Sequence, residues 1–468
     1  LGSAFASPPA PRSLEAQRLS LGISGEMANG FDMDLNYTYS AEQNEGKQPD
    51  TSTSRFLNAI RGGSGSPGTW NLFDSTSNSQ ELIDYISTAQ GTFVDVELHV
   101  LDFVMTGTVN DLEVATGFQM RKEHHDVARN DDSIAGFDAN GNLAVPADLI
   151  FLGGGIETSA SRSAYAIFAE AAKQASERVE LRGAIRYEKL ESDSSINPKV
   201  SIRMQANDNL VLRGSLSTSF REPSLSQLNQ SSVGLQGVQD FDAAGNAVGQ
   251  PSFIRIAQAY SSDLIPEEST NMNIGAIWTP NDQFSAKFDY WSIDYTDVIT
   301  IESAQGKVIA DPNGPDVQRL VDGTLIGVTT RYKNASEVDT DGYDIEASYN
   351  FESRLGDVTL GINRAHMLSY EIPAAGGGSK DVLGLFNHDN FARSLPETKT
   401  VISASLVNGQ HSMSAFYRMI SDYKTTNVPN AFATSVGLGQ DIDEFNVLDL
   451  KYSYSFDMDD SNLSLSFG

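Results

Sequence analysis

Histidine and aspartate residues cluster at one point of the sequence, where they could bind a metal ion. His124, His125 and Asp126 are consecutive, and Asp131 and Asp132 follow shortly after. Imidazole nitrogens and carboxylate oxygens are common metal ligands, so one histidine together with the aspartates could hold a cation. Adjacent residues of a strand point to opposite faces, however, so both histidines cannot easily bind the same ion. We therefore interpret this segment as a polar loop entrance and predict no metal site.

Two short glycine-ended motifs resemble each other but lack the ligands of a calcium site. GFDANG occupies residues 136–141 and FDAAG occupies residues 241–245. A calcium loop needs several further oxygen ligands in register, and Asp138 and Asp242 have no such companions. Both motifs are rich in turn-forming residues, so we predict hairpin turns within loops.

The residues needed for common enzymatic chemistry are missing. The chain has no cysteine and only six histidines, none of them in a zinc-protease motif, and it has no usable Gly-x-Ser-x-Gly nucleophile motif. We predict that the protein is not an enzyme and uses no cofactor. The 62 acidic against 32 basic residues give a net charge of −30. This charge argues against nucleic acid as a partner, because phosphate binding requires a basic surface.

One arginine stands where a predicted strand gives way to a long loop. Residues 220–223 read Phe-Arg-Glu-Pro, and Pro223 cannot donate a ladder hydrogen bond, so it ends the strand. We expect Arg221 to pair with carboxylates of the lumen, and contact with a ligand is the alternative interpretation.

These candidate residues are expected to be positioned by strands, because apolar and polar residues alternate along most of the chain. Val179, Leu181 and Ile185 alternate with Glu180 and Arg182, for example. Successive side chains of a strand point to opposite faces, so one face is apolar and the other is charged. The charged face meets water, and the apolar face needs either a protein core or lipid.

Short turns and long polar connections alternate along the chain. Tight turns such as residues 28–30 and 207–209 join two strands each. About 16 strands fit this template, and many approach the roughly 10 residues that a tilted membrane strand requires. The long connections are residues 41–91, 127–158, 222–266, 302–324, 371–393 and 425–441.

The pattern predicts an all-β fold: a transmembrane antiparallel β-barrel with short periplasmic turns and long extracellular loops. Apolar faces are rich in aromatic residues such as Phe288, whereas its neighbours Lys287 and Asp289 belong to the opposite face. A lipid-facing exterior and a polar lumen explain both faces. Residues 53–61 and 79–86 have helical spacing, so we expect the first long loop to be folded.

Residues 210–227 resemble the TonB-dependent outer-membrane receptors. The sequence LVLRGSLSTSFREPSLSQ is similar to the family's Arg-x-Ser…Phe-Arg-x-Pro-Ser pattern through Arg213, Ser215, Phe220, Arg221, Pro223 and Ser224. Similar stretches follow the family's order along nearly the whole chain, at residues 71–73, 185–187, 197–199, 267–280, 288–291, 334, 342–345 and 395–399.

The resemblance implies a barrel of about 22 strands around an N-terminal plug domain. Residues 1–468 would then be a partial barrel domain, a fragment that lacks the plug, the TonB box and the last strands. It also implies a monomeric receptor in the outer membrane of a Gram-negative bacterium, in contact with outer-membrane lipid. Such a receptor takes up a scarce nutrient (a siderophore, cobalamin, another metal chelate or a saccharide), with energy relayed through TonB by the missing N-terminal region.

Residues of the long loops and the strand ends are the first candidates for contact with a small-molecule or oligosaccharide ligand. We select the aromatic side chains together with one arginine: Trp70, Phe73, Tyr85, Arg221, Phe253, Tyr260, Phe386 and Phe391. Two alternative functions stay open, namely a passive porin of about 16–18 strands and a soluble all-β glycan-binding protein.

Overall fold

One large antiparallel sheet dominates the computed structural model, which describes residues 9–191, 193–334, 337–374, 378–387, 392–426, 431–458 and 461–468. In these residues the sheet has 17 strands, of which β20 (Ser379–Asp381) is a short addition to β19. The other sixteen confirm the predicted all-β fold and strand number. They are β1 (Arg12–Glu26), β2 (Asp32–Thr51), β3 (Ser87–Val109), β4 (Leu112–Arg129), β7 (Thr158–Ser176), β8 (Val179–Lys189), β9 (Ser194–Asn207), β10 (Leu210–Arg221), β13 (Glu267–Asn281), β14 (Phe284–Thr296), β18 (Val338–Ser353), β19 (Gly356–Pro373), β23 (Thr398–Asn408), β24 (His411–Ile420), β27 (Phe445–Met458) and β28 (Ser461–Phe467).

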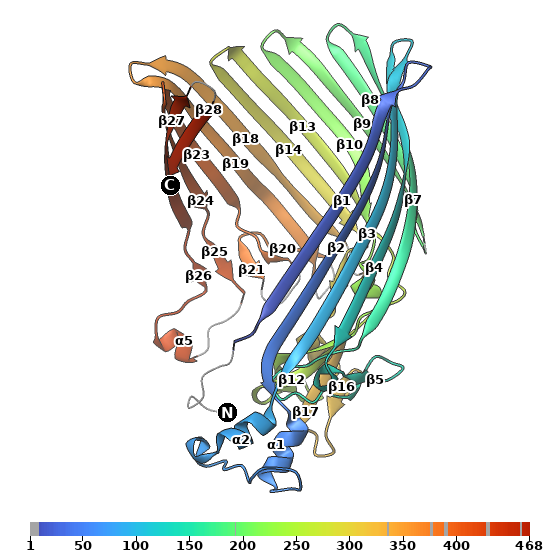
Figure 1. Cartoon of the computed structure of the whole chain (residues 1–468), viewed down its shortest axis with the longest axis vertical. Coiled ribbons are helices and arrows are strands. Elements are labelled where there is room, and N and C mark those ends of the chain that lie inside the picture. The colour runs from blue at the N-terminus through green and yellow to red at the C-terminus, as the bar shows by residue number, and fades with distance from the viewer. Residues whose placement is uncertain are drawn as a thin grey trace.

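The sheet curls into a wall whose long strands follow one another in sequence order. Figure 1 shows β1 in blue along one edge and β27 and β28 in red along the other, with the inner side visible between them. Within the described residues, β1 pairs only with β2 and β28 pairs only with β27. The inclined strands and the curvature are those of a barrel wall.

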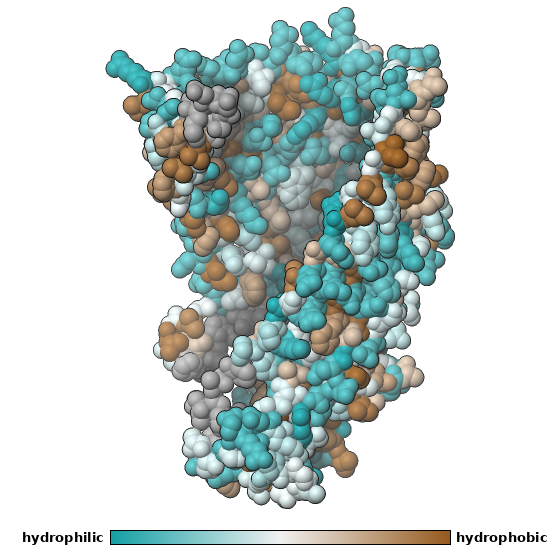
Figure 2. Space-filling model, in the orientation of Figure 1, coloured by the Kyte–Doolittle hydropathy of each residue, from teal (hydrophilic) through white to brown (hydrophobic). Residues whose placement is uncertain are grey.

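The two faces of the wall differ as the alternation predicts. In β8, Leu181 and Ile185 are 44% and 52% exposed on the outer side, whereas Glu188 on the inner side is only 3% exposed. Figure 2 shows hydrophilic side chains lining the hollow between the two edges, and hydrophobic ones on the outer flanks. No helix in the described residues is both long enough and apolar enough to cross a membrane.

The two ends of the wall are built differently. Tight turns at the top of Figure 1, the short-turn end, join strands such as β3 and β4, while the long loops gather at the bottom, the long-loop end. The predicted helices in the first loop are confirmed as α1 and α2. The loop elements are α1 (Thr53–Ile60), η1 (Ser75–Ser77), α2 (Gln80–Ile86), η2 (Asp131–Ser133), β5 (Gly136–Phe137), β6 (Leu143–Val145), α3 (Leu225–Asn229), β11 (Ser232–Phe241), β12 (Ala247–Ala259), β15 (Ile299–Ile301), α4 (Ala304–Ala310), β16 (Val317–Arg319), β17 (Leu325–Asn334), β21 (Leu385–Asn387), β22 (Arg393–Ser394), β25 (Tyr423–Thr425), α5 (Ala431–Ser435) and β26 (Asp441–Ile442).

The first long loop is shorter than the sequence suggests. Strands β2 and β3 stay paired from Ala41 opposite Glu97 up to Thr51 opposite Ser87, so residues 41–51 and 87–91 are strand and not loop. This hairpin runs on beyond the alternating part of the sequence, with polar residues on both of its faces. Backbone hydrogen bonds do not require apolar and polar side chains to alternate, so they continue the hairpin beyond the alternating residues.

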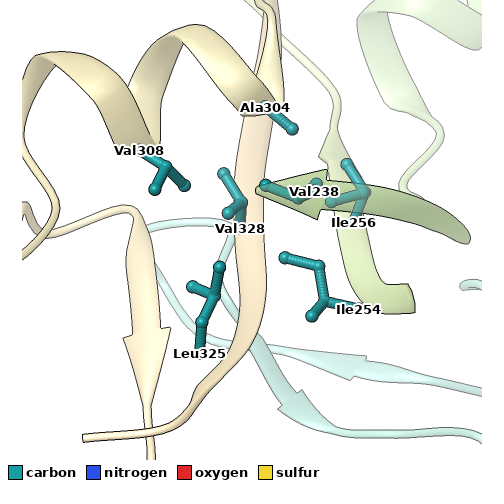
Figure 3. Close-up of a cluster of buried hydrophobic side chains, with 7 residues drawn as sticks. All are labelled: Val238, Ile254, Ile256, Ala304, Val308, Leu325 and Val328. Carbon is teal, nitrogen blue, oxygen red and sulfur yellow. The ribbon is translucent and has the colours of Figure 1, made fainter. Parts of the chain in front are cut away.

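A hydrophobic core holds the middle loops together at the long-loop end. Figure 3 shows Val308 of α4 packed among side chains of β11, β12 and β17, and both Val308 and Val238 are fully buried. Strand β12 pairs in parallel with β17, from Arg255 opposite Gly327 onward, which joins two loops that are distant in sequence. The complete cluster is Val238, Ile254, Ile256, Ala304, Val308, Leu325 and Val328.

Three smaller buried clusters support the other loops. One fixes α1 against α2 around Trp70 and Ile86. A second joins residues 135–149 to Val233 of β11, and a third packs Ile372 of β19 against Val382. The long loops up to residue 395 therefore form a packed layer over one end of the wall, because they bury apolar side chains against their neighbours.

Candidate functional site

A network of arginine and glutamate side chains joins the loop after β10 to the inner wall. Arg162 on β7 contacts Glu123 on β4 at 2.7 Å and Glu222 after β10 at 3.4 Å. Arg121 on β4 contacts the same two carboxylates at 2.9 and 3.6 Å and Glu188 on β8 at 3.1 Å. Arg186 on β8 also contacts Glu188 at 2.7 Å, so three cations meet three carboxylates at the long-loop end of the lumen.

Glu222 is the carboxylate of this network whose hydrogen bonding is incomplete. Its side chain is 10% exposed, and its Oε2 atom is buried without a hydrogen-bond partner although both arginines stand nearby. Burial raises the pKa of the Glu222 carboxyl; Arg162 and Arg121 oppose this rise, and Glu123 and Glu188 add to it. The charge of Glu222 therefore depends on the two arginines.

The other residues of the Phe-Arg-Glu-Pro segment have structural partners as well. Arg221 forms two hydrogen bonds with Glu267 on β13, at 2.5 and 2.6 Å, and Glu267 also accepts the backbone N–H of Ile299. The carbonyl of Pro223 accepts a hydrogen bond from Arg162. Ser224 caps α3 through a reciprocal capping box with its third residue, Gln227. The expected pairing of Arg221 is confirmed, and the segment connects three strands and a helix.

A second candidate site is a cavity on the inner wall near the short-turn end. It has a volume of about 610 Å³ and is lined by side chains of β8, β9, β10, β13, β14 and β18. Arg213 binds both carboxylate oxygens of Asp289. Lys199 and Arg203, which also line the cavity, form no ion pair within the described residues. The inner wall thus presents two unpaired cations in a chain that is strongly acidic overall, beside Asp344, a carboxylate of the same cavity that also forms no ion pair within the described residues.

The predicted ligand-contacting aromatics fall into two groups. Trp70 is 6% exposed and packs edge-on against Phe56, and the Tyr85 hydroxyl accepts a hydrogen bond from Asn58 at 2.9 Å, so both support the first loop. In contrast, Phe73 and Phe253 are 101% and 80% exposed at the loop layer.

The remaining predicted aromatics do not gather at one point. Tyr260 is half exposed at the end of β12. Phe386 lies in β21, which pairs with β22 and β25. Phe391 lies outside the described residues. A ligand role for any of these side chains stays a prediction.

The segments considered for metal binding have other partners. His124 forms a hydrogen bond with its neighbour Asp126 at 2.7 Å, and no group of three or more metal-ligating residues occurs in the described part of the chain. Asp138 accepts the backbone N–H groups of Asn140 and Asn142 at 2.8 and 2.9 Å. Asp242 accepts two backbone N–H groups in the same way. The prediction of two hairpin turns is confirmed.

Sequence reasoning missed the most connected part of the site. Arg121, Arg162 and Glu188 lie on three strands, and their positions give no local motif. Alternation could have placed them on the inner face, but only the strand register brings Glu123 opposite Arg162. Alternation could have placed Lys199 and Arg203 on the inner face in the same way, because both belong to the polar face of β9.

The wall and its two ends define a class of protein. A curved antiparallel sheet with an apolar outer face, a polar inner face, tight turns at one end and folded loops at the other is an outer-membrane β-barrel. A family profile described as TonB dependent receptor-like, beta-barrel matches residues 2–468. The chain therefore belongs to the TonB-dependent receptor family, whose members are outer-membrane proteins of Gram-negative bacteria.

Solved structures of this family share the fold at low sequence identity. The siderophore receptor PirA from Acinetobacter baumannii superposes with a TM-score of 0.62 at 13% identity, over 95% of this chain and 57% of that one. The ferric enterobactin receptor PfeA from Pseudomonas aeruginosa, in complex with enterobactin, gives 0.61 at 14% identity, over 95% and 55%. The copper transporter OprC gives 0.57 at 13% identity, over 96% and 59%. The chain thus spans a little over half of each. A comparison with curated protein sequences finds no match.

Proposed function

We propose that this chain is the larger part of the barrel wall of a receptor that captures a scarce nutrient and takes it up with energy relayed through TonB. The observation that carries the proposal is a packed layer of loops over one end of a wide polar lumen, in a chain of the TonB-dependent receptor family. Tight capture and subsequent passage require a driven conformational change, because a ligand cannot shift the equilibrium beyond its own differential affinity.

The remaining organisation of the receptor is part of the same proposal. A plug domain and further barrel strands would complete residues 1–468, joining the edges of β1 and β28. A closed porin of about 16–18 strands would require these two edges to pair with each other. They do not pair within the described residues, so this alternative has no support in the sheet.

A metal chelate is the ligand class that we favour. PirA and PfeA are named as siderophore and ferric enterobactin receptors, and OprC as a copper transporter. In this chain, the exposed Phe73 and Phe253 offer apolar contacts at the loop layer, and Lys199 and Arg203 offer positive charge along the inner wall. An anionic, partly aromatic chelate fits both features.

Uptake by the full-length receptor tests the proposal. A strain that lacks the gene should grow more slowly on limiting iron with a ferric siderophore as the source, and the gene should restore growth only when TonB is present. Uptake of a labelled ferric siderophore should show the same dependence. Restored uptake without TonB would instead indicate passive diffusion, and normal growth of the deletion strain on every iron and copper chelate supplied would remove the chelate class.

A further inference from the structure

One arginine that has no anionic partner in the described part of the chain faces outward from the wall. Arg364 on β19 lies opposite Ile345 of β18 and Thr400 of β23. Ile345 in turn lies opposite Phe288 of β14, which is 46% exposed on the outer face. Tyr343, two residues before Ile345, belongs to the same outer face, because its ring lies 5.9 Å from the ring of Phe288 and 4.9 Å from the ring of His366. Arg364 is therefore on the lipid side.

Among the described residues, no hydrogen-bond or ion-pair partner is found for the guanidinium of Arg364. Its Nε atom is buried and has no hydrogen-bond partner, and within the described residues the side chain forms no ion pair. Asp341, a carboxylate of the same face, already accepts hydrogen bonds from Tyr290 and Ser369. A charged group on the lipid side is costly near the middle of the bilayer and is tolerated close to the interface. A lipid-facing arginine is therefore expected to lie close to the membrane interface and to pair with an anion.

The strand geometry places Arg364 near the extracellular boundary of the membrane. It lies eight residues beyond Gly356, the first residue of β19. At about 3.3 Å per residue and a tilt of about 40° this is roughly 20 Å of height, near the top of an apolar band about 25 Å tall. The neighbouring strand β23 begins at Thr398, only two residues from Thr400. The outer leaflet is thus within reach of the guanidinium.

We propose that Arg364 binds a phosphate group of a phosphorylated glycolipid in the outer leaflet, with His366 and Tyr343 beside the headgroup. The planar guanidinium fork matches the oxygens of a phosphate. The His366 ring forms a 2.7 Å hydrogen bond between its Nδ1 and the Thr398 hydroxyl and lies 4.9 Å from the ring of Tyr343, two residues along the same face from Arg364.

Carboxylates just above the site limit where the phosphate can sit. Asp294, Asp339 and Glu371 lie opposite one another across β14, β18 and β19, toward the long-loop end. They repel a phosphate at their own height. The level of Arg364 is therefore the position at which this part of the wall attracts an anion.

Binding of lipid A to the full-length receptor tests this site. Vesicles of phosphatidylethanolamine would carry either bis-phosphorylated lipid A or the same lipid after removal of its phosphates, and lipid that stays bound to the extracted receptor would be counted by native mass spectrometry. We expect one lipid A to be retained only in the phosphorylated form. For R364Q we expect affinity to fall about tenfold, the size of one charge-assisted hydrogen bond.

Two further variants keep the result interpretable. R418Q neutralises an arginine that pairs with Asp449 on the lumen side, so it should bind lipid A as the unmodified receptor does. R364K keeps the charge but loses the fork and should bind at an intermediate level. Equal retention of both forms of lipid A, or equal binding by R364Q and R418Q, would overturn the proposal. The wild-type comparison of the two lipids does not depend on the folding of any variant.

Discussion

Removing the guanidinium of Arg162 should loosen the loop that follows β10. In R162M the contacts of Arg162 with Glu123 and Glu222 and its hydrogen bond to the Pro223 carbonyl are lost, while a side chain of similar length remains. Within the described residues, Arg121 is then the only cation in contact with Glu123 and Glu222, while Glu188 keeps its contact with Arg186 as well. Glu222, which already has one buried oxygen without a hydrogen bond, loses its nearer arginine.

The burial of the pair sets the size of this effect. The side chains of Arg162 and Glu222 are each 10% exposed, and breaking a buried ion pair by removing one partner costs about 3–5 kcal/mol. The matched control is R418M on the lumen side of β24. Arg418 and its partner Asp449 are 53% and 46% exposed, and an exposed pair contributes about 1 kcal/mol or less.

Hydrogen exchange of the full-length receptor in lipid vesicles measures this loss locally. If the cost appears as local opening, amides of residues 222–231 should exchange between about a hundredfold and several thousandfold faster in R162M, and little faster in R418M. R162M/E222Q should recover part of the protection, because it removes the uncompensated carboxylate. Losing Arg162 raises the pKa of Glu222 further, so mild acid should protonate Glu222 and reduce the effect of R162M. Equal exchange in R162M and R418M, or no recovery in the double variant, would refute this reasoning.

Three further predictions concern the loop layer and the strand end beneath it. V308A should destabilise the core of the middle loops by about 1–3 kcal/mol, seen as faster proteolysis of these loops with the barrel intact, because Val308 is fully buried. Burial alone would raise the pKa of Asp316, but hydrogen bonds from Lys307 and Arg331 outweigh it and hold this pKa below its usual value. The ionised carboxylate therefore stabilises the loops above the ordinary carboxyl range, and the contribution is lost as pH falls through the lowered pKa; D316N should abolish this acid dependence in a proteolysis-against-pH series. R221Q should cost about 1 kcal/mol in thermal unfolding, because Arg221 is 54% exposed although its bond to β13 is bidentate; a loss above 3 kcal/mol would show that we underestimate this pair.

Much of the wall could be predicted from the sequence because a bilayer enforces alternation. The apolar side chains of β8 and β14 must face lipid, and their neighbours must face water, so faces and approximate strand ends are visible in the residues themselves. The same argument fails where a hairpin leaves the bilayer. Beyond Ala41 and Glu97, polar residues occupy both faces of the hairpin and the alternation ends, while the backbone pairing of β2 and β3 continues.

The candidate site was only partly predictable, for a different reason. The sequence marks Arg221 through the proline that follows it, and its ion pair was expected. The contacts of Arg162 with Glu123 and Glu222 depend on the register of two strands and on the path of a loop, which no local pattern encodes. The aromatic loop residues show the same limit, since Trp70 and Phe73 look alike in sequence but differ in exposure from 6% to 101%. Packing between distant segments decides which of the two is buried.

The network around Glu222 gives the loop layer a direct mechanical connection to the wall. Residues 222–224 are held to β4 and β7 by Arg121 and Arg162, and to α3 by the capping box of Ser224. The chain from α3 onward enters β11, whose Val238 belongs to the core that joins the middle loops. A displacement of residues 222–224 therefore either breaks the ion pairs of Glu222 or moves the strands that carry the arginines. Because breaking a buried ion pair is costly, we expect the position of residues 222–224 to follow the position of β4 and β7.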